Sequence, residues 1–341
     1  MRRVAWIGMV VMVVSCSKDP YADRSVNNEL VVLAEITAGD SLKVPVSKSI
    51  QVGSGGIISF EKVNSAIVKI ARPDGNSYTL RLNNSPQYVG DPASIYTAPQ
   101  RPHAGMTYSL QVQDPLSGTV TAKTTIPPAV RVSAMDTSNG NHSGYPVLHC
   151  HFTLLDTPGV SRYYIFEAVK QLAKMGHSFI WQGKRYGYET SEGRKLYEQV
   201  KNVPGVVLQT DTLWLNQYQR LNVFTDDNNV DNALVASLNL PFRRIFLTRL
   251  NFDGSYTTDF YVDKTYFSSD LESQKGRVLI QVKSVSTELY NYLFYYEKYK
   301  SDVGSIPPGQ LYSPPGNVQN GLGIFGGSSK RQWMYYFDGL R

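Results

Sequence analysis

The chain has 341 residues, a formal net charge of +6 and 18% charged side chains. This length suits two domains of about 100–200 residues each, and the aromatic content of 12% argues against extended disorder. No block of basic residues suits a phosphate backbone, so nucleic acid is not expected as a partner. Only two cysteines are present, Cys16 and Cys150, which excludes a disulfide framework.

Residues 1–15 have the layout of a secretory signal peptide, with Arg2 and Arg3 before the apolar run Val4–Val14. The run is too short to cross a bilayer as a helix, which takes roughly 20 apolar residues. Val13-Val14-Ser15-Cys16 resembles the lipobox of bacterial lipoproteins. We therefore predict cleavage before Cys16, lipidation of its thiol and anchoring of the mature chain by acyl chains. In the alternative, the signal peptide is of the ordinary kind and Cys16 has no role.

Residues 16–28 are polar and lack an apolar period, which predicts a lipidated tether. Ser17-Lys18-Asp19 resembles the short charged signals that direct some lipoproteins to the outer face of the outer membrane. We therefore expect an outer-membrane lipoprotein that faces the cell exterior. The alternatives are that the protein faces the periplasm and that these charges only keep the tether solvated.

Residues 29–128 contain short alternating segments separated by Gly, Pro and Asn turns, which is typical of an Ig-like β-sandwich. The predicted strands are 30–36, 42–50, 66–70, 78–82, 108–112 and 119–124. Pro45 predicts that the second of them is an edge strand, because proline cannot donate to a ladder. Ile126-Pro127-Pro128 breaks the pattern and marks the predicted domain boundary.

Residues 129–341 are expected to form a second, larger β domain with one or two short helices, so the predicted fold class is mainly β. The predicted strands are 147–152, 163–169, 213–215, 221–224, 245–247, 256–262 and 277–285. A short helix is predicted from Ser191 to Val200, capped by Ser191. A second is predicted from Ser286 to Tyr299, capped by Ser286.

Tyrosines crowd the second predicted helix, and four of them lie on neighbouring positions of one stripe. These candidates for partner binding are Tyr292, Tyr295, Tyr296 and Tyr299. A tyrosine stripe offers area and polar tips to a partner or a sugar. Packing on the second sheet is the interpretation we favour, because amphipathic faces are core faces more often than interfaces.

Catalytic motifs are not found: the sequence has no His-Glu-x-x-His, Gly-x-Ser-x-Gly, phosphate loop or dinucleotide fingerprint. We therefore predict no catalytic residues and no cofactor, and do not expect an enzyme. His149 and His151 lie two apart on a strand and could bind a metal together. A third ligand with metal-binding spacing is missing, so the solvent side of a strand is the interpretation we favour.

Asp227, Asn229 and Asp231 alternate as in a calcium loop. The sixth position lacks glycine, and Leu238 stands where a bidentate glutamate would be needed. The sequence therefore favours a solvated turn, and no metal site is predicted here.

The segment Asn320–Gly327 carries four glycines in eight residues, which excludes an ordinary helix because too much backbone entropy would be lost. We predict a loop that buries Phe325 within its own domain.

The longer run Asn317–Gly327 resembles the hallmark near the end of the DUF4249 family. Four further segments agree with that family in order along the mature chain: Gly105–Leu110, Thr124–Pro127, Asn251–Gly254 and Lys283–Tyr290. Arg249-Leu250 departs from it, since the family often has an acidic turn there. Members are lipoproteins of unassigned function, often encoded beside TonB-dependent outer-membrane transporters, and the family supplies no catalytic or ligand residues.

The resemblance implies a TonB-dependent outer-membrane transporter as the partner. Together with the lipobox, it predicts a non-catalytic accessory lipoprotein that binds or presents cargo. The alternatives are a surface glycosidase or peptidase with an unrecognised carboxylate site, and a passive adhesin or envelope-structural lipoprotein. Two carboxylates about 5–10 Å apart in a pocket would favour the glycosidase.

Overall fold

The computed structural model describes residues 28–338 except 53–56, 86–90, 157–161, 232–242, 249–253, 266, 268–273 and 302–313. The predicted signal peptide, Cys16, the tether up to residue 27 and the turn at 251–253 lie outside the described residues. The described chain is mainly β with two short helices, α1 (Ser191–Val200) and α3 (Thr287–Ser301), which confirms the predicted fold class. Neither helix has the length and apolarity needed to span a membrane.

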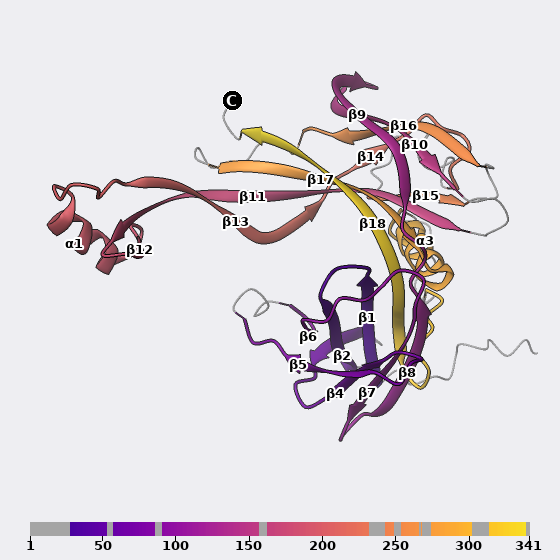
Figure 1. The fold of residues 1–341 in the computed structure, drawn as a ribbon. Coiled ribbons are helices and arrows are strands. Elements are labelled where there is room, and N and C mark those ends of the chain that lie inside the picture. Colours follow the sequence, from indigo (N-terminus) through magenta and orange to yellow (C-terminus); the bar gives the residue numbers. More distant parts are fainter. Residues whose placement is uncertain are drawn as a thin grey trace, which may run out of the picture.

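A 14-stranded sheet runs through both halves of the molecule (Figure 1). Its main path is β12 (Lys184–Gly187), β11 (Tyr163–Trp181), β17 (Gln274–Val285), β18 (Leu322–Asp338), β1 (Leu30–Thr37), β2 (Leu42–Val52), β6 (Ser94–Ala98), β5 (Ser77–Leu82), β4 (Ile67–Ala71), β7 (Thr107–Asp114) and β8 (Gly118–Thr125). Off this path, β13 (Gln209–Arg220) and β15 (Ile245–Thr248) pair with β11, and β3 (Ile57–Lys62) pairs with β2. A second sheet has the order β14 (Val223–Phe224), β16 (Ser255–Asp263), β10 (Tyr145–Leu155), β9 (Arg131–His142).

The two larger buried cores of the described chain are separated along the sequence between Ile126 and Val130, apart from Phe325, which belongs to the first core. The first lies inside β1–β8, where strands such as β7 alternate strictly between buried and exposed positions. The second lies between the four-stranded sheet and the part of the large sheet built from β11, β17 and β18. Phe152, Phe166 and Phe260 meet at its centre with ring centroids 4.6–5.9 Å apart.

β18 belongs to both halves of the molecule. Its first part pairs in parallel with β1, from Leu322 to Ser328, and its second part pairs antiparallel with β17, from Ser328 to Asp338. The predicted loop at 320–327 is therefore wrong, because most of this segment is a strand. Phe325 is fully buried, as predicted, but the core that it enters is that of residues 30–126.

The glycines of this segment permit close approach on both sides. Gly323 has φ +105°, and a Cβ there would lie 2.0 Å from the Val32 carbonyl oxygen. A Cβ on Gly326 would lie 2.5 Å from the Cβ of Leu289 on α3. Asn317 pairs with the backbone of Phe325 like a short strand: its Oδ1 accepts from Phe325 N at 2.8 Å and its Nδ2 donates to Phe325 O at 2.9 Å. Glycine thus allows β1 and α3 to lie close against β18.

The helix and edge predictions have mixed outcomes. The Oγ of Ser286 accepts from the backbone N of Leu289 at 3.4 Å, so the predicted cap of α3 is confirmed. The cap of α1 is Thr190, one residue before the predicted Ser191, because its hydroxyl accepts from Gly193 N at 2.9 Å. The edge assignment of Pro45 is wrong, since β2 lies between β1 and β6. The proline is tolerated because the pairing with β1 ends one residue away.

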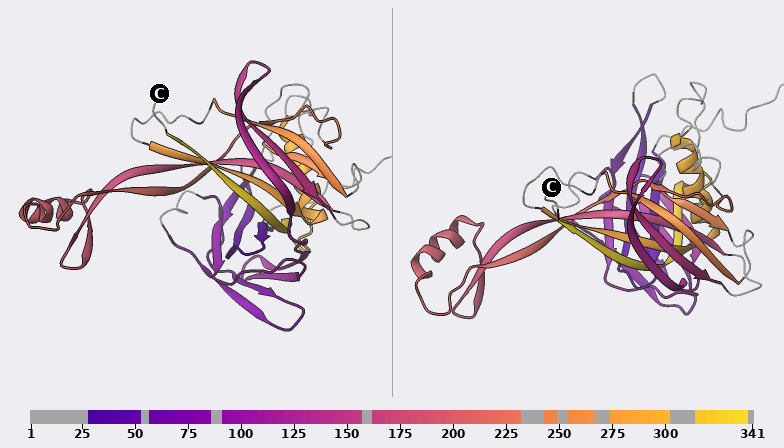
Figure 2. Two further views of the ribbon diagram at one scale, coloured as in Figure 1. Left: turned by 45° about the horizontal axis from the view of Figure 1, so that its top comes forward. Right: turned by 90° about the horizontal axis from the view of Figure 1, so that it is seen from above.

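A long arm projects from the body of the molecule (Figures 1 and 2). β11 has 19 residues, far more than the predicted 163–169, and its pairing with β17 ends at Lys174. Beyond that point it pairs with β13 and β12, and α1 lies at the tip. Fully buried Phe179 packs there between Tyr186 and Tyr197, at centroid distances of 5.7 and 5.1 Å. The tip therefore has a small aromatic core of its own.

Candidate functional site

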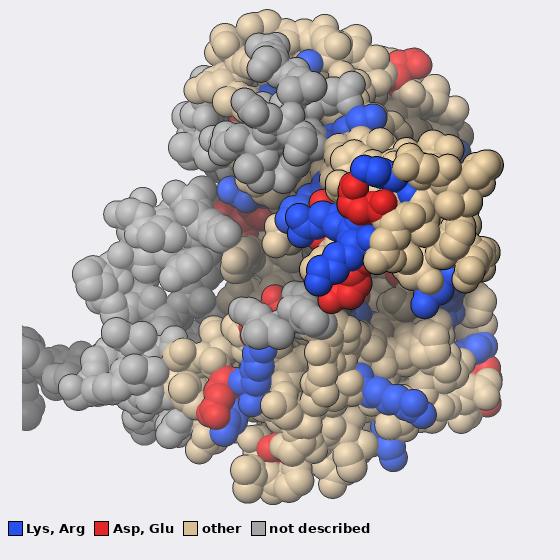
Figure 3. Space-filling view, turned by 90° about the vertical axis from the view of Figure 1, so that its left-hand side faces the viewer, with Lys and Arg blue, Asp and Glu red and all other residues tan. Residues whose placement is uncertain are grey.

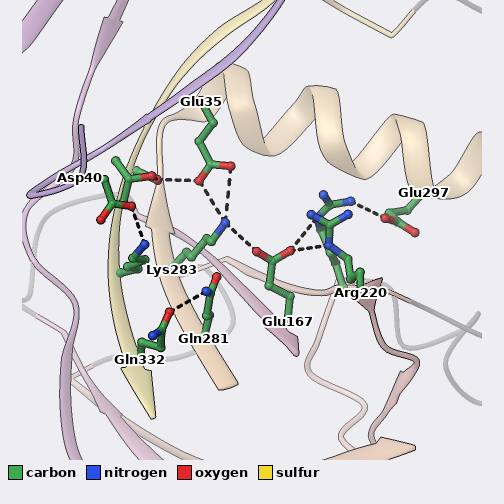
Figure 4. Close-up of polar contacts among 12 residues, drawn as sticks. Glu35, Asp40, Glu167, Arg220, Gln281, Lys283, Glu297 and Gln332 are labelled. Atoms are coloured by element: carbon green, nitrogen blue, oxygen red, sulfur yellow. Dashed lines mark hydrogen bonds and ion pairs between the residues drawn. The ribbon is translucent and has the colours of Figure 1, made fainter. Parts of the chain in front are cut away.

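A polar cluster lies where the two halves of the molecule meet (Figure 4). Lys283, on β17, places its Nζ 2.6 Å from Oε1 of Glu167 on β11 and 3.1 Å from Oε1 of Glu35 on β1. Ser328 of β18 donates to Glu35 at 2.7 Å. One ammonium thus joins carboxylates from the two halves of the chain.

The cluster continues on the other side of Glu167. Its Oε2 accepts from Nε of Arg220 at 2.9 Å and from Nε of Arg244 at 3.2 Å. Arg244 also pairs with Glu297 of α3. Glu167 is only 2% exposed, so these partners supply the compensation that a buried charge requires.

The electrostatics of the cluster favour the charged forms. Burial by itself would raise the pKa of Glu35 and of Glu167, but Lys283 and the other partners hold both pKa values below the ordinary range. Burial would lower the pKa of Lys283, yet the two carboxylates raise it. A glycosidase needs one carboxyl that holds a proton. Glu35 and Glu167 are close together but do not suit that role, and the cluster acts as a charge-paired junction.

A polar cleft of about 500 Å³ adjoins this junction. Its lining includes Glu35 and Asp40 together with Lys43 and Arg101. Asp40 also pairs with Lys330 of β18. On the face of the molecule that includes the arm, Lys and Arg lie beside Asp and Glu and neither sign dominates (Figure 3). The cleft suits a small polar ligand that carries both signs of charge.

The structure brings His149 and His151 together with a residue that sequence spacing did not identify. Both point outward from β10, and both hydrogen-bond to Oδ1 of Asp259 on β16, with His149 Nε2 at 2.6 Å and His151 Nδ1 at 2.8 Å. Partial burial would raise the pKa of Asp259, but these hydrogen bonds lower it. Asp259 lies 108 residues from His151 in sequence, so only the strand register could have indicated it.

The carboxylates of the 227–231 segment are engaged by hydroxyl groups. Asp227 accepts from Tyr256 and from Thr258, the latter at 2.7 Å. Its Oδ1 also accepts from Asn229 N at 2.9 Å, which forms an Asx turn. Asp231 accepts from the buried Tyr290. Both carboxylates thus tie the turn to the body of the protein.

Some side chains of the tyrosine stripe on α3 pack against the protein and others are exposed to solvent. Tyr292 packs beside the cluster formed by α3, β11 and β18, and burial raises its pKa to about 12. Tyr295 and Tyr296 are 39% and 37% exposed. The side chain of Tyr299 lies outside the described residues.

Comparisons with known proteins place the chain in a family but give no activity. A search of curated proteins finds no match. A manganese lipoxygenase of Gaeumannomyces graminis described with a partial zonadhesin of Komagataella pastoris matches over 93% of this chain and 97% of that chain, at 7% identity and a TM-score of 0.17. The Enterococcus faecalis MSCRAMM ACE, described as binding its ligands by the collagen Hug model, matches over 93% and 96%, at 7% identity and a TM-score of 0.15. At these scores neither structure supports an inference.

The family comparison is decisive because it spans most of the sequence. The domain of unknown function DUF4249 matches residues 18–333, which include both cores, the arm and most of β18. The chain therefore belongs to the DUF4249 family.

Proposed function

We propose that this protein is an outer-membrane lipoprotein, anchored through Cys16, that docks on a TonB-dependent transporter and binds or presents its cargo. The observation that carries the proposal is the projecting arm, because it extends ordered surface away from both cores. The lipobox-like segment and the family resemblance supply the anchor and the class of partner.

The arm has the properties of a contact element. Its tip is held by its own aromatic core, so little ordering entropy is lost when a partner binds. It also exposes apolar side chains, with Ile180 49%, Val207 63% and Leu213 56% accessible. Such residues scattered singly need no explanation, but together on a projection they favour a protein partner. The nearby polar cleft, with charges of both signs, is the proposed place for cargo.

The test is affinity isolation of the tagged lipoprotein from solubilised membranes. Met175 and Thr212 pair across the β11–β13 ladder, so residues 176–211 can be replaced by an Asn-Gly turn without breaking the register. We expect the transporter to co-purify with the wild-type protein and to be lost from the shortened variant. Both proteins should remain in the membrane fraction, since the anchor is unchanged.

Two exposed leucines provide a test position on the arm and a control position elsewhere. Leu213 lies at the base of the arm, paired with Lys174, whereas Leu116 lies in the turn between β7 and β8 and is 86% exposed. We expect Leu213→Asp to reduce the amount of co-purified transporter and Leu116→Asp to leave it unchanged. Equal recovery of the transporter with the wild-type protein and the shortened variant would exclude the arm as the docking element. Absence of a transporter from every sample would reject the proposed partner.

The proposed orientation is tested separately. Replacing Lys18 and Asp19 with Ala should preserve lipidation but remove protease accessibility in whole cells. Equal accessibility before and after the change would assign these charges to solvation of the tether.

A further inference from the structure

The outer face of the four-stranded sheet gathers metal-ligating side chains from three strands. β10 buries Leu148, Cys150 and Phe152, so the intervening His149 and His151 point away from the core. Register then fixes their neighbours. Opposite His149 are Tyr261 on β16 and Ser138 on β9. Opposite His151 are Asp259 on β16 and Asp136 on β9.

The ligand atoms converge on one point. Oδ1 of Asp259 lies 2.6 Å from His149 Nε2 and 2.8 Å from His151 Nδ1. As they stand, these atoms hydrogen-bond to one another, and the described part of the chain has no three such side chains already spaced around an ion. A tetrahedral ion with bonds of about 2.0–2.2 Å holds neighbouring ligand atoms roughly 3.3 Å apart. Each of the two imidazole nitrogens therefore needs to move away from Oδ1 of Asp259 by less than about 1 Å.

Rotation of the side chains can supply that separation. The side chains of His149, His151 and Asp259 are 33%, 46% and 45% exposed, so no core packing holds them in place. The backbone beneath them is fixed by ladders on both sides of β10. Asp136 of β9 lies directly opposite His151. Because the Cβ atoms of such a cross-strand pair lie about 4.5–5.5 Å apart, the Asp136 carboxylate can reach the position between the two histidines and Asp259.

The surroundings of His149 resemble the outer shell of a metal ligand. Its Nδ1 lies 3.3 Å from Oγ of Ser138, which leaves Nε2 directed at the site. The Tyr261 ring stacks on His149 at 5.1 Å and on His142 at 4.4 Å, which supports one face of the His149 imidazole without enclosing it. Hydrogen bonding of the second ring nitrogen is the usual way in which proteins orient a ligating histidine.

We propose that His149, His151 and Asp259 form a binding site for a divalent transition-metal ion, with Asp136 as a further ligand. Two imidazoles and carboxylates suit zinc, nickel or copper better than calcium or magnesium, which prefer oxygen ligands alone. The proposal does not depend on the arm or on the transporter.

The test uses the full-length lipoprotein, purified in detergent with a tag that contains no histidine and stripped with a chelator. Zn²⁺ is titrated by calorimetry, and Co²⁺ is added in parallel because its visible spectrum reports ligand geometry. We expect one high-affinity Zn²⁺ per chain. Asp259→Asn and His151→Gln should each weaken binding at least tenfold, since each removes one ligand.

The chain offers a matched control on the arm. Exposed His177 also pairs with an acid, Glu189, at 3.1 Å, but has no second histidine beside it. His177→Gln should bind Zn²⁺ like the wild-type protein. Circular dichroism of each apo variant verifies that the sheet is intact. Absence of Zn²⁺, Ni²⁺ and Cu²⁺ binding up to about 1 mM would overturn the proposal. So would binding that survives both Asp259→Asn and His151→Gln, or that His177→Gln weakens equally.

Discussion

Phe325→Ala should destabilise both halves of the protein, although the residue lies near the end of the chain. Phe325 is fully buried in the core of residues 30–126. Burying a phenylalanine contributes about 1.5–3 kcal/mol, and a residual cavity adds about 24 cal/mol per Å³. The backbone of Phe325 is held by β1 on one side and by Asn317 on the other, so the site cannot easily collapse. We therefore expect a loss of about 3–5 kcal/mol in the free energy of unfolding.

Urea unfolding with two probes measures this loss. The four tryptophans are Trp6, Trp181, Trp214 and Trp333. None lies between residues 29 and 128, so tryptophan fluorescence reports the second half of the molecule, whereas circular dichroism reports strands in both halves. Because β18 pairs with β1 and with β17, both transitions should shift together to lower urea. Leu116→Ala, at an exposed turn, should change stability by less than about 0.5 kcal/mol.

Two results would refute this reasoning. A loss below about 1 kcal/mol would show that the core does not depend on this ring. A shift seen by circular dichroism without a shift in fluorescence would show that β18 does not couple the two halves.

Three further outcomes follow from the structure and a fourth from the sequence. Burial would raise the pKa of Glu167, but Lys283 and two arginines lower it. The ionised carboxylate therefore contributes to stability at neutral pH, and this contribution is lost as the pH falls below about 4.5, the ordinary pKa of the group. Glu167→Gln should flatten the acid side of a stability–pH profile and lower the free energy of unfolding by about 3–5 kcal/mol at pH 7. Gly326→Ala should lower stability by about 1–3 kcal/mol in urea because its Cβ would meet α3 at 2.5 Å. Burial raises the pKa of the Cys150 thiol to about 12, so a thiol reagent should label it only in denaturant. Cys16→Ala should abolish the lipid mass and membrane partition, and unchanged values would reject the anchor.

Local alternation was sufficient to predict most strands. β7 shows it clearly, and each predicted strand overlaps an observed one, although 66–70 begins one residue before β4 and 221–224 begins two residues before β14. β9 was missed because Val132 is its one buried residue, so both of its faces are exposed along most of its length and show no apolar alternation. β18 was missed because glycines depress strand propensity, and its partner β1 lies about 290 residues away.

The candidate sites were predictable only in part, for a similar reason. His149 and His151 could be recognised as a pair from their spacing of two. The residue that joins them, Asp259, is brought in by pairing of β10 with β16, which no local pattern encodes. The ion cluster at the junction needs Glu35, Glu167 and Lys283 from three distant strands. Long-range register therefore decides the chemistry of both places.

The order of strands also bears on how the proposed anchor and the proposed docking arm are related. The chain enters β1 directly after the tether, and β1, β18, β17 and β11 are hydrogen-bonded neighbours in that order. The last of these strands continues into the arm. A continuous series of hydrogen-bonded strands thus runs from β1, which follows the predicted tether, to the tip of the arm. The ion pairs of Lys283 with Glu35 and Glu167 link β1 to β11 across this series. Buried ion pairs contribute more to specific geometry than to net stability in some proteins. Here the junction fixes the direction of the arm relative to β1, which the proposed docking of an anchored protein would require.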